Sequence, residues 1–317
     1  MNEFKLIDVF FKKDVLARKD VIFGIGDDAA CIEVPAGHQV LISTDTLVAD
    51  VHFLSSWDPY IIAWKAVMVN VSDIAAMAAE PCWVSLALTL PTLDLKWLER
   101  FSLGFHAALK QYNIALIGGD TTKGPLSITL TIHGLVPSGK FVRRSGAKIG
   151  DEIWVTGQLG AAAQAVKCLE GYYQVAANDF AQLLYKLQYP KPRVDFISLL
   201  QTFATAAIDI SDGLSGDLNH ICEESNTGAC LDLVAIPSHP LVKKYQKEKT
   251  IDFVLQGGDD YELCFTIRPD NHDSFSQALK ECQLTCYQIG VIEKEKGLRG
   301  SYNGQIKAIS VQSYSHF

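Results

Sequence analysis

The strongest constraint in the sequence is an apolar segment of strand length that turns polar abruptly. Residues 40–42 read Val-Leu-Ile and are followed at once by Ser43, Thr44, Asp45 and Thr46. The apolar run predicts a buried strand, and carboxylates and hydroxyls at its carboxyl end are typical of a ligand site. These hard oxygen ligands suit Mg²⁺ rather than zinc. The alternative at this point is an ordinary strand end followed by a turn or a helix cap.

Acidic residues recur in similar settings along the chain. They lie in glycine turns, at predicted strand ends or in the apolar helix that is predicted to begin at Asp58-Pro59: Asp27 and Asp28, Asp45, Asp73, Asp120, Asp209 and Asp212, and Asp259, Asp260 and Glu262. One such cluster would be a cap or a turn, but six predict convergence on one site. Carboxylates packed together repel one another or take up protons unless cations neutralise them. Several Mg²⁺ ions would do so and would leave a surface that accepts phosphate oxygens.

Composition excludes several classes of protein. The chain has 317 residues, of which 48% are hydrophobic and 20% charged, and its net charge is −8. These values are expected of a globular protein of about two domains and argue against a nucleic-acid binder with a basic surface. The start of the chain shows no secretory signal, and Lys65, Asn70 and Asp73 interrupt the longest apolar stretch, 61–79, so no membrane span is expected. Eight cysteines without a CxxC pair favour reduced thiols in a cytoplasmic protein and do not fit a zinc site.

Periodicity predicts an α+β fold made of two α/β units. Helices are expected over 3–12, from 58 onward, over 94–112, 160–170 and 270–281, and after Gly213, with strands over 30–34, 40–42, 82–91, 114–117, 127–136, 152–157, 206–211, 229–234, 252–267, 287–292 and 305–310. Residues 137–151 are rich in Gly, Lys, Arg and Ser without an apolar period, which predicts the boundary between the units. This segment holds Arg143 and Arg144, and a charged linker is often simply solvated. An arginine here is also what an acidic chain would direct at a phosphate tail.

Several well-known motifs are absent. Neither GxxxxGK[ST] nor GxSxG occurs, and GIGDDA at 24–29 lacks the third glycine and the helix of a dinucleotide fingerprint. His133 lies in an alternating strand and is expected to be structural. His52 follows closely behind Asp45, and its sequence position leaves open whether it faces the site.

Eight segments together resemble the thiamine-monophosphate kinase family, in the superfamily that also holds aminoimidazole ribonucleotide synthetase and selenophosphate synthetase. They are GIGDDAA, STDTLVADVHF, NVSDIAAMAAEP, IGGDTTKGPLSITLTIHG, RSGAKIGD, IDISDGLSGDL, GGDDYELCFT and the terminal HF. The segments occur in the family's order, and the resemblance extends over nearly the whole chain. Each motif alone is modest, but the set is highly specific.

The resemblance implies an enzyme that transfers the γ-phosphoryl group of ATP directly to thiamine monophosphate, in line, with several Mg²⁺ ions. It also implies a homodimer. The N-terminal domain, residues 1–137, would bind ATP and magnesium and pair with its copy through a mixed sheet. The C-terminal α/β sandwich, residues 150–317, would complete the nucleotide and substrate site.

Site residues follow from the resemblance, motif by motif. The implied metal ligands are Asp28, Ser43, Thr44, Asp45, Asp73, Asp120, Asp209 and Asp212; Gly119, Asp120, Arg144 and Ser211 would contact ATP; and His52, Asp259 and Tyr314 would contact the thiamine phosphate. Two departures affect the substrate contacts. Asp259 stands where the family usually has Glu, and the tail SYSHF lacks the glycine that more often precedes the aromatic residue.

The implied chemistry agrees with the acidic pattern. A phosphate oxygen is already an anionic nucleophile, so we expect no general base, and Asp45 and Asp120 would act electrostatically. One rival is another enzyme of the superfamily, acting on a purine precursor or forming selenophosphate. The latter would need a reactive Cys near the N-terminus, and none precedes Cys31. A rival from another class is a non-catalytic nucleotide sensor, which ATP binding without turnover would favour.

Overall fold

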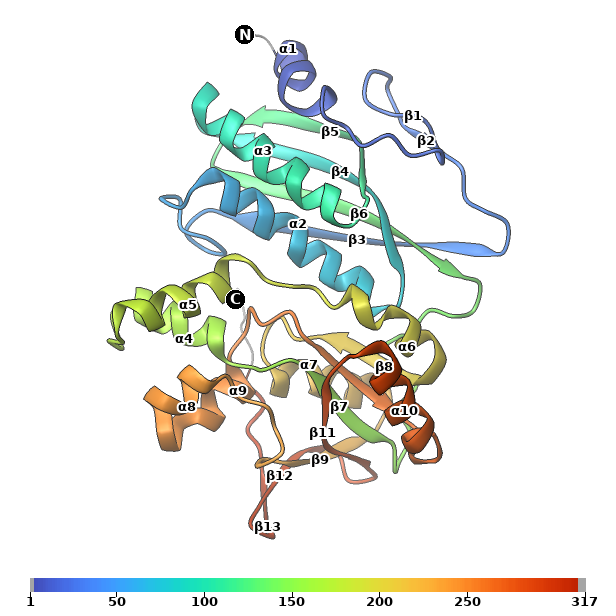
Figure 1. Cartoon of the computed structure of the whole chain (residues 1–317), viewed down its shortest axis with the longest axis vertical. Coiled ribbons are helices and arrows are strands. Elements are labelled where there is room, and N and C mark those ends of the chain that lie inside the picture. Colours follow the sequence, from blue (N-terminus) through green and yellow to red (C-terminus); the bar gives the residue numbers. More distant parts are fainter. Residues whose placement is uncertain (1–2, 313–317) are drawn as a thin grey trace. The chain divides into compact units, whose positions relative to one another are not determined.

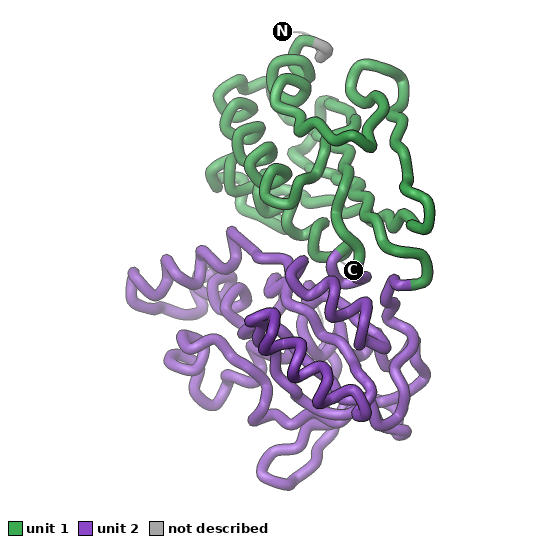
Figure 2. Tube along the Cα trace, turned by 45° about the vertical axis from the view of Figure 1, so that its right-hand side comes forward, with its two compact units in different colours: residues 1–74, 79–139 green, residues 75–78, 140–317 purple. Residues whose placement is uncertain are grey.

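The chain forms two compact units, seen in a computed structural model that describes residues 3–312 (Figure 1, Figure 2). Unit 1 comprises residues 1–74 and 79–139, and unit 2 comprises residues 75–78 and 140–317. The chain leaves unit 1 at Gly139, inside the polar segment 137–151.

A four-stranded mixed sheet forms the centre of unit 1. Its strand order is β3-β6-β4-β5, with β3 at His38–Val48, β4 at Glu80–Leu90, β5 at Ala115–Lys123 and β6 at Ser127–Pro137. β6 pairs antiparallel with β3 and β4, whereas β4 and β5 are parallel. β1 (Val21–Phe23) and β2 (Cys31–Ile32) form a separate two-stranded sheet, and Val21 and Ile32 pack against the cluster that contains Trp83 of β4 and Ile117 of β5.

Two long helices, α2 (Pro59–Ala76) and α3 (Leu95–Gln111), cover one face of this sheet (Figure 1). A short helix α1 (Glu3–Ile7) and the π-helical turn η1 (Asp8–Lys12) precede the sheet in the chain. Aspartates fix the starts of both long helices, since Asp58 accepts the backbone N–H of Tyr60 at 2.9 Å and Asp94 caps α3. Leucine and isoleucine side chains of β4 and β6 are buried under these helices, among them Leu86 and Leu130.

On the opposite face of the unit 1 sheet, the part around Thr44 of β3 is polar and accessible, whereas Trp83 of β4 is buried. Thr44 and Thr131 lie across from each other on β3 and β6 with their hydroxyl oxygens 2.9 Å apart, and Thr46 and Thr129 repeat the contact at 2.8 Å. Ile42 lies on the same face, two residues from Thr44, and is 64% exposed. We refer to this surface as the open face.

Unit 2 is built on a seven-stranded sheet in the order β13-β12-β9-β11-β7-β10-β8. The strands are β7 (Glu152–Thr156), β8 (Ala204–Asp209), β9 (Gly228–Asp232), β10 (Leu263–Ile267), β11 (Cys286–Glu293), β12 (Gly297–Tyr302) and β13 (Gln305–Ala308). β9 and β12 are parallel, and the other neighbouring strands of this sheet are antiparallel.

Both faces of the unit 2 sheet are buried, as alternation along β7 shows. Ile153 and Val155 belong to the core that contains Leu218 of α7 (Leu214–Glu224), whereas Trp154 belongs to the core with Phe275 of α10 (His272–Cys282). The remaining helical segments are α4 (Ala161–Leu169), α5 (Ala177–Gln188), η2 (Val194–Phe196), α6 (Ile197–Phe203), α8 (Pro240–Gln246), η3 (Lys247–Lys249), α9 (Thr250–Gln256) and η4 (Pro269–Asn271).

Two sequence expectations about secondary structure are wrong. The strand predicted over 252–267 is confined to β10, because residues 250–256 form α9. Ile251, Val254 and Leu255 have helical spacing, and all three pack against the unit 2 core. The strands predicted to end before Ser43 and Gly118 continue to Val48 and Lys123, since β6 and β4 extend their ladders. The predicted two-unit α+β architecture is confirmed. In the described part of the chain, no helix combines the length and apolar character that crossing a bilayer requires.

Gly104 provides a test of the packing in unit 1. A Cβ at this position of α3 would lie 2.2 Å from the carbonyl oxygen of Tyr60 in α2. Replacing glycine by alanine within a helix ordinarily stabilises by up to ~1 kcal/mol, but overpacking costs about 1–3 kcal/mol. We therefore expect Gly104→Ala to lower the free energy of unfolding in a urea titration. Leu103→Ala, at an exposed neighbour, is the control, and a Gly104→Ala protein as stable as wild type would contradict the close helix contact.

Candidate functional site

Ser43 and Asp73 are brought together in unit 1. Ser43 lies within β3, Asp73 lies near the end of α2, and the Ser43 hydroxyl donates to Oδ2 of Asp73 at 2.5 Å. This contact provides a partner for the one acidic side chain of α2. A hydroxyl and a carboxylate at hydrogen-bond distance form a pair of hard oxygen atoms suited to a divalent cation.

Thr44 lies between Ser43 and Asp45 but points to the other side of the sheet. Successive side chains of a strand alternate, and the Thr44 hydroxyl contacts Thr131 on the open face. Ser43 and Asp45 therefore share the face that α2 covers. A bond from Thr44 to a metal on that side would have to come from its main chain.

Asp45 and Asp120 occupy different edge strands of the unit 1 sheet. Asp45 lies on β3 and Asp120 on β5, with β6 and β4 between them. Three strand spacings amount to roughly 14 Å. Gly119 lies beside Leu86 with a φ of +153°, and a Cβ there would meet the Leu86 carbonyl oxygen, so the position requires glycine. Asp28 is exposed, in the turn between β1 and β2.

Residues 3–312 contain no group of three or more His, Cys, Asp or Glu side chains that could hold a metal ion. Mg²⁺ is usually bound through one or two carboxylates, several waters and the phosphates of a substrate, rather than by a cage of protein ligands. The oxygen donors of Ser43, Asp45 and Asp73 fit that kind of site.

His52 lies in a turn that fixes its protonation pattern. Its Nδ1 accepts the backbone N–H of Val48 at 3.0 Å, and its own backbone N–H bonds the Val48 carbonyl. Asp50 in this turn has a φ of +61° and accepts the backbone N–H of Ser55. Because Nδ1 is an acceptor, the neutral imidazole carries its proton on Nε2, where it is a donor.

In unit 2 the segments 209–213 and 257–262 lie side by side. The backbone N–H of Asp259 donates to the Ser211 carbonyl at 2.8 Å, that of Tyr261 to Ile210 at 2.9 Å, and that of Ile210 to Glu262 at 2.8 Å. These bonds continue the antiparallel ladder of β8 and β10 beyond its regular end, where Leu263 pairs with Asp209. The structure thus brings Ser211 and Asp259, predicted from separate motifs, to adjacent positions.

The segment 257–262 adopts an unusual backbone conformation. Asp259 has a φ of +66° and Tyr261 a φ of +50°, values that are uncommon for residues with side chains. At Gly258 a Cβ would lie 2.4 Å from the Ser211 carbonyl oxygen, so this close approach requires glycine. Such conformations persist only where surrounding contacts hold them.

The other two acids of GGDDYE contact the protein itself. Asp260 accepts the backbone N–H of Gly160, at the N-terminus of α4, at 2.8 Å, and burial of its carboxyl raises its pKa well above the ordinary value. Glu262 accepts the Thr156 hydroxyl at 2.6 Å. Of the three acids predicted to join one site, Asp260 and Glu262 instead fix the loop that presents Asp259.

Asp217 is a site residue that sequence reasoning missed. Its side chain accepts the backbone N–H groups of Asp212 and Gly213 at 3.2 and 3.1 Å, and so holds the turn that carries Ser211 and Asp212. Burial, and then the neighbouring charge of Asp212, raise the pKa of Asp217 to about 7. The available signal was an acidic residue on the otherwise buried first turn of α7.

Arg144 is exposed and lies close enough to Asp217 to oppose the rise in its pKa. Its position follows from the backbone, since the carbonyl of Arg143 accepts the N–H of Ala207 in β8 and that of Arg144 accepts the Ser225 hydroxyl. Asp209 is buried at the end of β8. Tyr314 lies outside the described residues.

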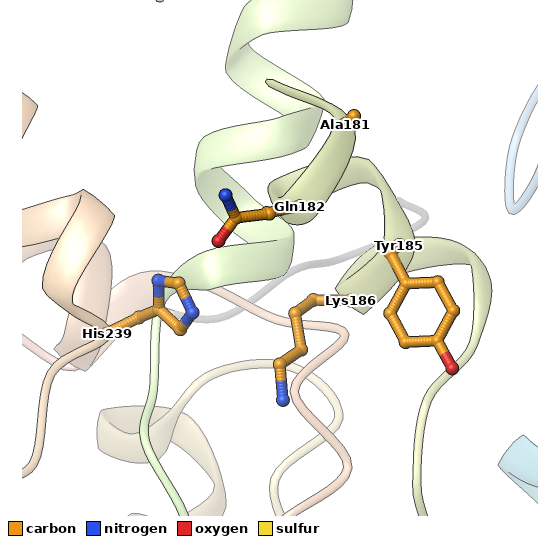
Figure 3. A pocket seen from close by; sticks show the side chains of 5 residues that line it. All are labelled: Ala181, Gln182, Tyr185, Lys186 and His239. Atoms are coloured by element: carbon orange, nitrogen blue, oxygen red, sulfur yellow. The ribbon is translucent and has the colours of Figure 1, made fainter. Parts of the chain in front are cut away.

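A surface pocket of about 350 Å³ in unit 2 contains none of the predicted site residues. It is lined by Ala181, Gln182, Tyr185, Lys186 and His239 (Figure 3). Gln182 and His239 lie next to each other, Lys186 lies beside them, and Tyr185 points away. Burial and the charge of Lys186 lower the pKa of His239, whose Nδ1 accepts the backbone N–H of Leu241. The lining of the pocket contains no buried ionisable side chain, so we do not place the functional site there.

Asp217 predicts a pH dependence of stability. Because the folded state raises the pKa of Asp217 from 3.8 to about 7, the folded protein binds this proton more tightly than the unfolded chain. The resulting stability is fully present below about pH 4 and is lost as the pH rises to about 7, by up to ~4 kcal/mol. We expect Asp217→Asn, which keeps an acceptor oxygen, to remove this slope in denaturant titrations with a chelator present. Asp252→Asn, at an exposed site, is the control; an unchanged slope in Asp217→Asn would contradict the assignment.

Comparison with known proteins identifies the family. Residues 26–136 match the N-terminal domain of the AIR synthase related proteins, and residues 148–303 match their C-terminal domain. The thiamine-monophosphate kinase of Escherichia coli strain K12 is 44% identical over 319 residues, covering 100% of this chain and 98% of the relative.

Two solved structures agree with this result. The thiamine-monophosphate kinase of Stenotrophomonas maltophilia K279a has a TM-score of 0.87 at 40% identity and covers 96% of this chain and 98% of its own. The complex of AaThiL with AMPPCP and TMP has a TM-score of 0.80 at 32% identity and covers 99% and 97% of the two chains. The two domain matches, the full-length identity and the shared fold lead to one conclusion: the chain belongs to the thiamine-monophosphate kinase family of AIR synthase related proteins.

Proposed function

We propose that this protein is an ATP-dependent kinase that converts thiamine monophosphate to thiamine diphosphate and releases ADP. The observation that carries the proposal is the 44% identity to a thiamine-monophosphate kinase along the entire chain. Support comes from the AaThiL structure with AMPPCP and TMP, because AMPPCP replaces the bridging β,γ-oxygen of ATP by carbon. That pair of ligands is what a kinase using ATP and a phosphorylated acceptor requires.

We propose that hard oxygen atoms from both units bind Mg²⁺. In unit 1 these are the side chains of Asp28, Ser43, Asp45, Asp73 and Asp120 with the main chain of Thr44, and in unit 2 Asp209 and Asp212. The Ser43–Asp73 contact at 2.5 Å supports the first group, and the buried strand-end position of Asp209 supports the second. Bound Mg²⁺ would supply the positive charge that neutralises the phosphates.

The remaining site residues would bind the two substrates. Gly119, Asp120, Arg144 and Ser211 would contact ATP, and His52, Asp259 and Tyr314 would contact the thiamine phosphate. Gly119 is exposed, so its backbone is accessible to a nucleotide, and the exposed guanidinium of Arg144 suits a phosphate. His52 would donate from Nε2 to a phosphate oxygen, because Nδ1 is already an acceptor.

The transfer would need no general base, since the attacking phosphate oxygen is already anionic. The obstacle is repulsion between the two substrates, as two unit charges ~4 Å apart cost about 4 kcal/mol at an effective dielectric of ~20. Each such pair corresponds to roughly three decades in rate if it is fully relieved. In-line positioning of the phosphates and neutralisation of their charge are therefore the main tasks of these side chains.

We further propose that the protein is a cytoplasmic homodimer that pairs through the open face of unit 1. That face carries paired threonine hydroxyls and the exposed Ile42. Each threonine pair makes one hydrogen bond within the face, so covering the pair costs less than covering two hydroxyls that do not contact each other.

The function is tested by measuring ADP release from ATP and Mg²⁺ with and without thiamine monophosphate, together with identification of the product. We expect thiamine diphosphate to form in equal amount to ADP. ATP binding without turnover would instead support a nucleotide sensor. Turnover only with a purine precursor would be consistent with the family assignment but would show that thiamine monophosphate is not the substrate.

Asp45→Asn and Asp120→Asn test the electrostatic role in this assay. We expect each variant to lose at least about a hundredfold in kcat while its circular dichroism and melting temperature stay close to wild type, because each change removes one anionic oxygen donor. Asp94→Asn, at the exposed cap of α3, is the matched control. Near-normal rates at saturating Mg²⁺ in both site variants would disprove the role.

Ile42→Lys tests the proposed dimer. A charge at the open face should weaken association by at least about tenfold, because an unpaired buried charge is costly at an interface. Sedimentation velocity should then show monomer at concentrations where the wild type is a dimer. Leu103→Lys, an exposed apolar position on α3, should remain dimeric. An unchanged sedimentation coefficient for Ile42→Lys would exclude this face.

A further inference from the structure

We propose that Arg193, acting through Glu262, is a positioning residue that sets the affinity for the phosphate acceptor by holding Asp259 in place. The proposal rests on the proposed function, in which Asp259 contacts the acceptor. Arg193 itself need not touch either substrate.

The loop that carries Asp259 requires outside support. Asp259 and Tyr261 both have positive φ angles, and neither is glycine. A non-glycine residue with φ in this range is strained unless its surroundings fix the backbone. The backbone bonds to Ile210 and Ser211 support one side of the loop. The side chain of Glu262 supports the other.

Glu262 is bound from two directions. Its Oε2 accepts the Thr156 hydroxyl at 2.6 Å and Nη1 of Arg193 at 3.0 Å. A methyl group at Gly157 would lie 1.9 Å from this carboxylate, so the glycine leaves the space that Glu262 occupies. Thr156 is fully buried and also accepts the backbone N–H of Leu263, which ties the contact to the first residue of β10.

Arg193 is itself fixed in position. Nε and Nη2 donate to the two oxygens of Asp195 at 3.0 Å each, and the guanidinium lies 4.6 Å from the ring centroid of Phe196. Burial lowers the pKa of Arg193, but its carboxylate partners outweigh burial and raise it. A planar guanidinium can bind Asp195 with two donors and reach Glu262 with a third, a geometry that a lysine ammonium cannot reproduce.

The consequence is a selective effect on one substrate. Without Arg193, Glu262 keeps its hydrogen bond from Thr156 but loses the bond from the guanidinium. The loop that carries Asp259 is then held less firmly. The turn with Ser211 and Asp212 keeps its own support from Asp217 and β8. Acceptor binding should therefore weaken more than ATP binding.

Steady-state kinetics of Arg193→Gln and Arg193→Lys provide the first test, with Arg268→Gln, at an exposed position of unit 2, as the matched control. We expect KM for thiamine monophosphate to rise about tenfold in Arg193→Gln, consistent with loss of one charge-assisted hydrogen bond, while KM for ATP stays within about twofold. Arg193→Lys should recover only part of the loss. Equal changes in both KM values, or none, would overturn the proposal.

Hydrogen exchange provides a second test that does not depend on activity. The amides of Asp259 and Tyr261 should exchange about tenfold faster in Arg193→Gln than in Arg268→Gln, while those of β7 should not change. Unchanged exchange in the loop would overturn the positioning role. If the wild type did not phosphorylate thiamine monophosphate, the proposed function would fail, and this measurement would still decide whether Arg193 holds the loop.

Discussion

The hydrogen bonds that extend the β8–β10 ladder are the interaction on which the unit 2 site depends. Two segments far apart in the sequence, 209–213 and 257–262, are joined through their main chains just past the ends of regular strands. Side chains then fix each segment separately: Asp217 bonds the turn at Asp212, and Asp260 and Glu262 bond the loop around Asp259. The residues predicted to meet substrates are thus presented by a framework of hydrogen-bonded carboxylates, of which Asp217 is buried.

Much of the architecture could be predicted from the sequence because burial leaves a periodic pattern. Alternation predicted β4, the start signal Asp58-Pro59 predicted α2, and a stretch without apolar period coincides with the passage from unit 1 to unit 2. The acidic motifs identified candidate residues such as Asp45 and Asp259, because carboxylates next to apolar segments are costly to bury unless a partner or a metal ion binds them. Each of these inferences used only the chemistry of residues near one another in the sequence.

What could not be predicted depends on partners far away in the chain. The length of β3 is set by β6. Of the polar residues that suggested a strand end, Thr44 lies on the open face, whereas Ser43 lies on the covered face and bonds Asp73 of α2. The acids of GGDDYE look alike in sequence. In the structure Asp260 accepts a hydrogen bond from Gly160 and Glu262 accepts one from Thr156, and these distant partners give the two acids a different role from Asp259. The position of Asp120 relative to Asp45 follows from strand order, which no local pattern encodes.

The bond between Asp260 and the N-terminus of α4 also couples two parts of unit 2 in their opening. Lifting the loop would leave the amide of Gly160 without its partner and expose a carboxyl whose burial depends on the helix. Fraying of α4 would equally release the loop. The loop and α4 should therefore open together, as one cooperative unit, rather than fluctuate independently. Any movement of the loop that admits a substrate would then involve α4 as well.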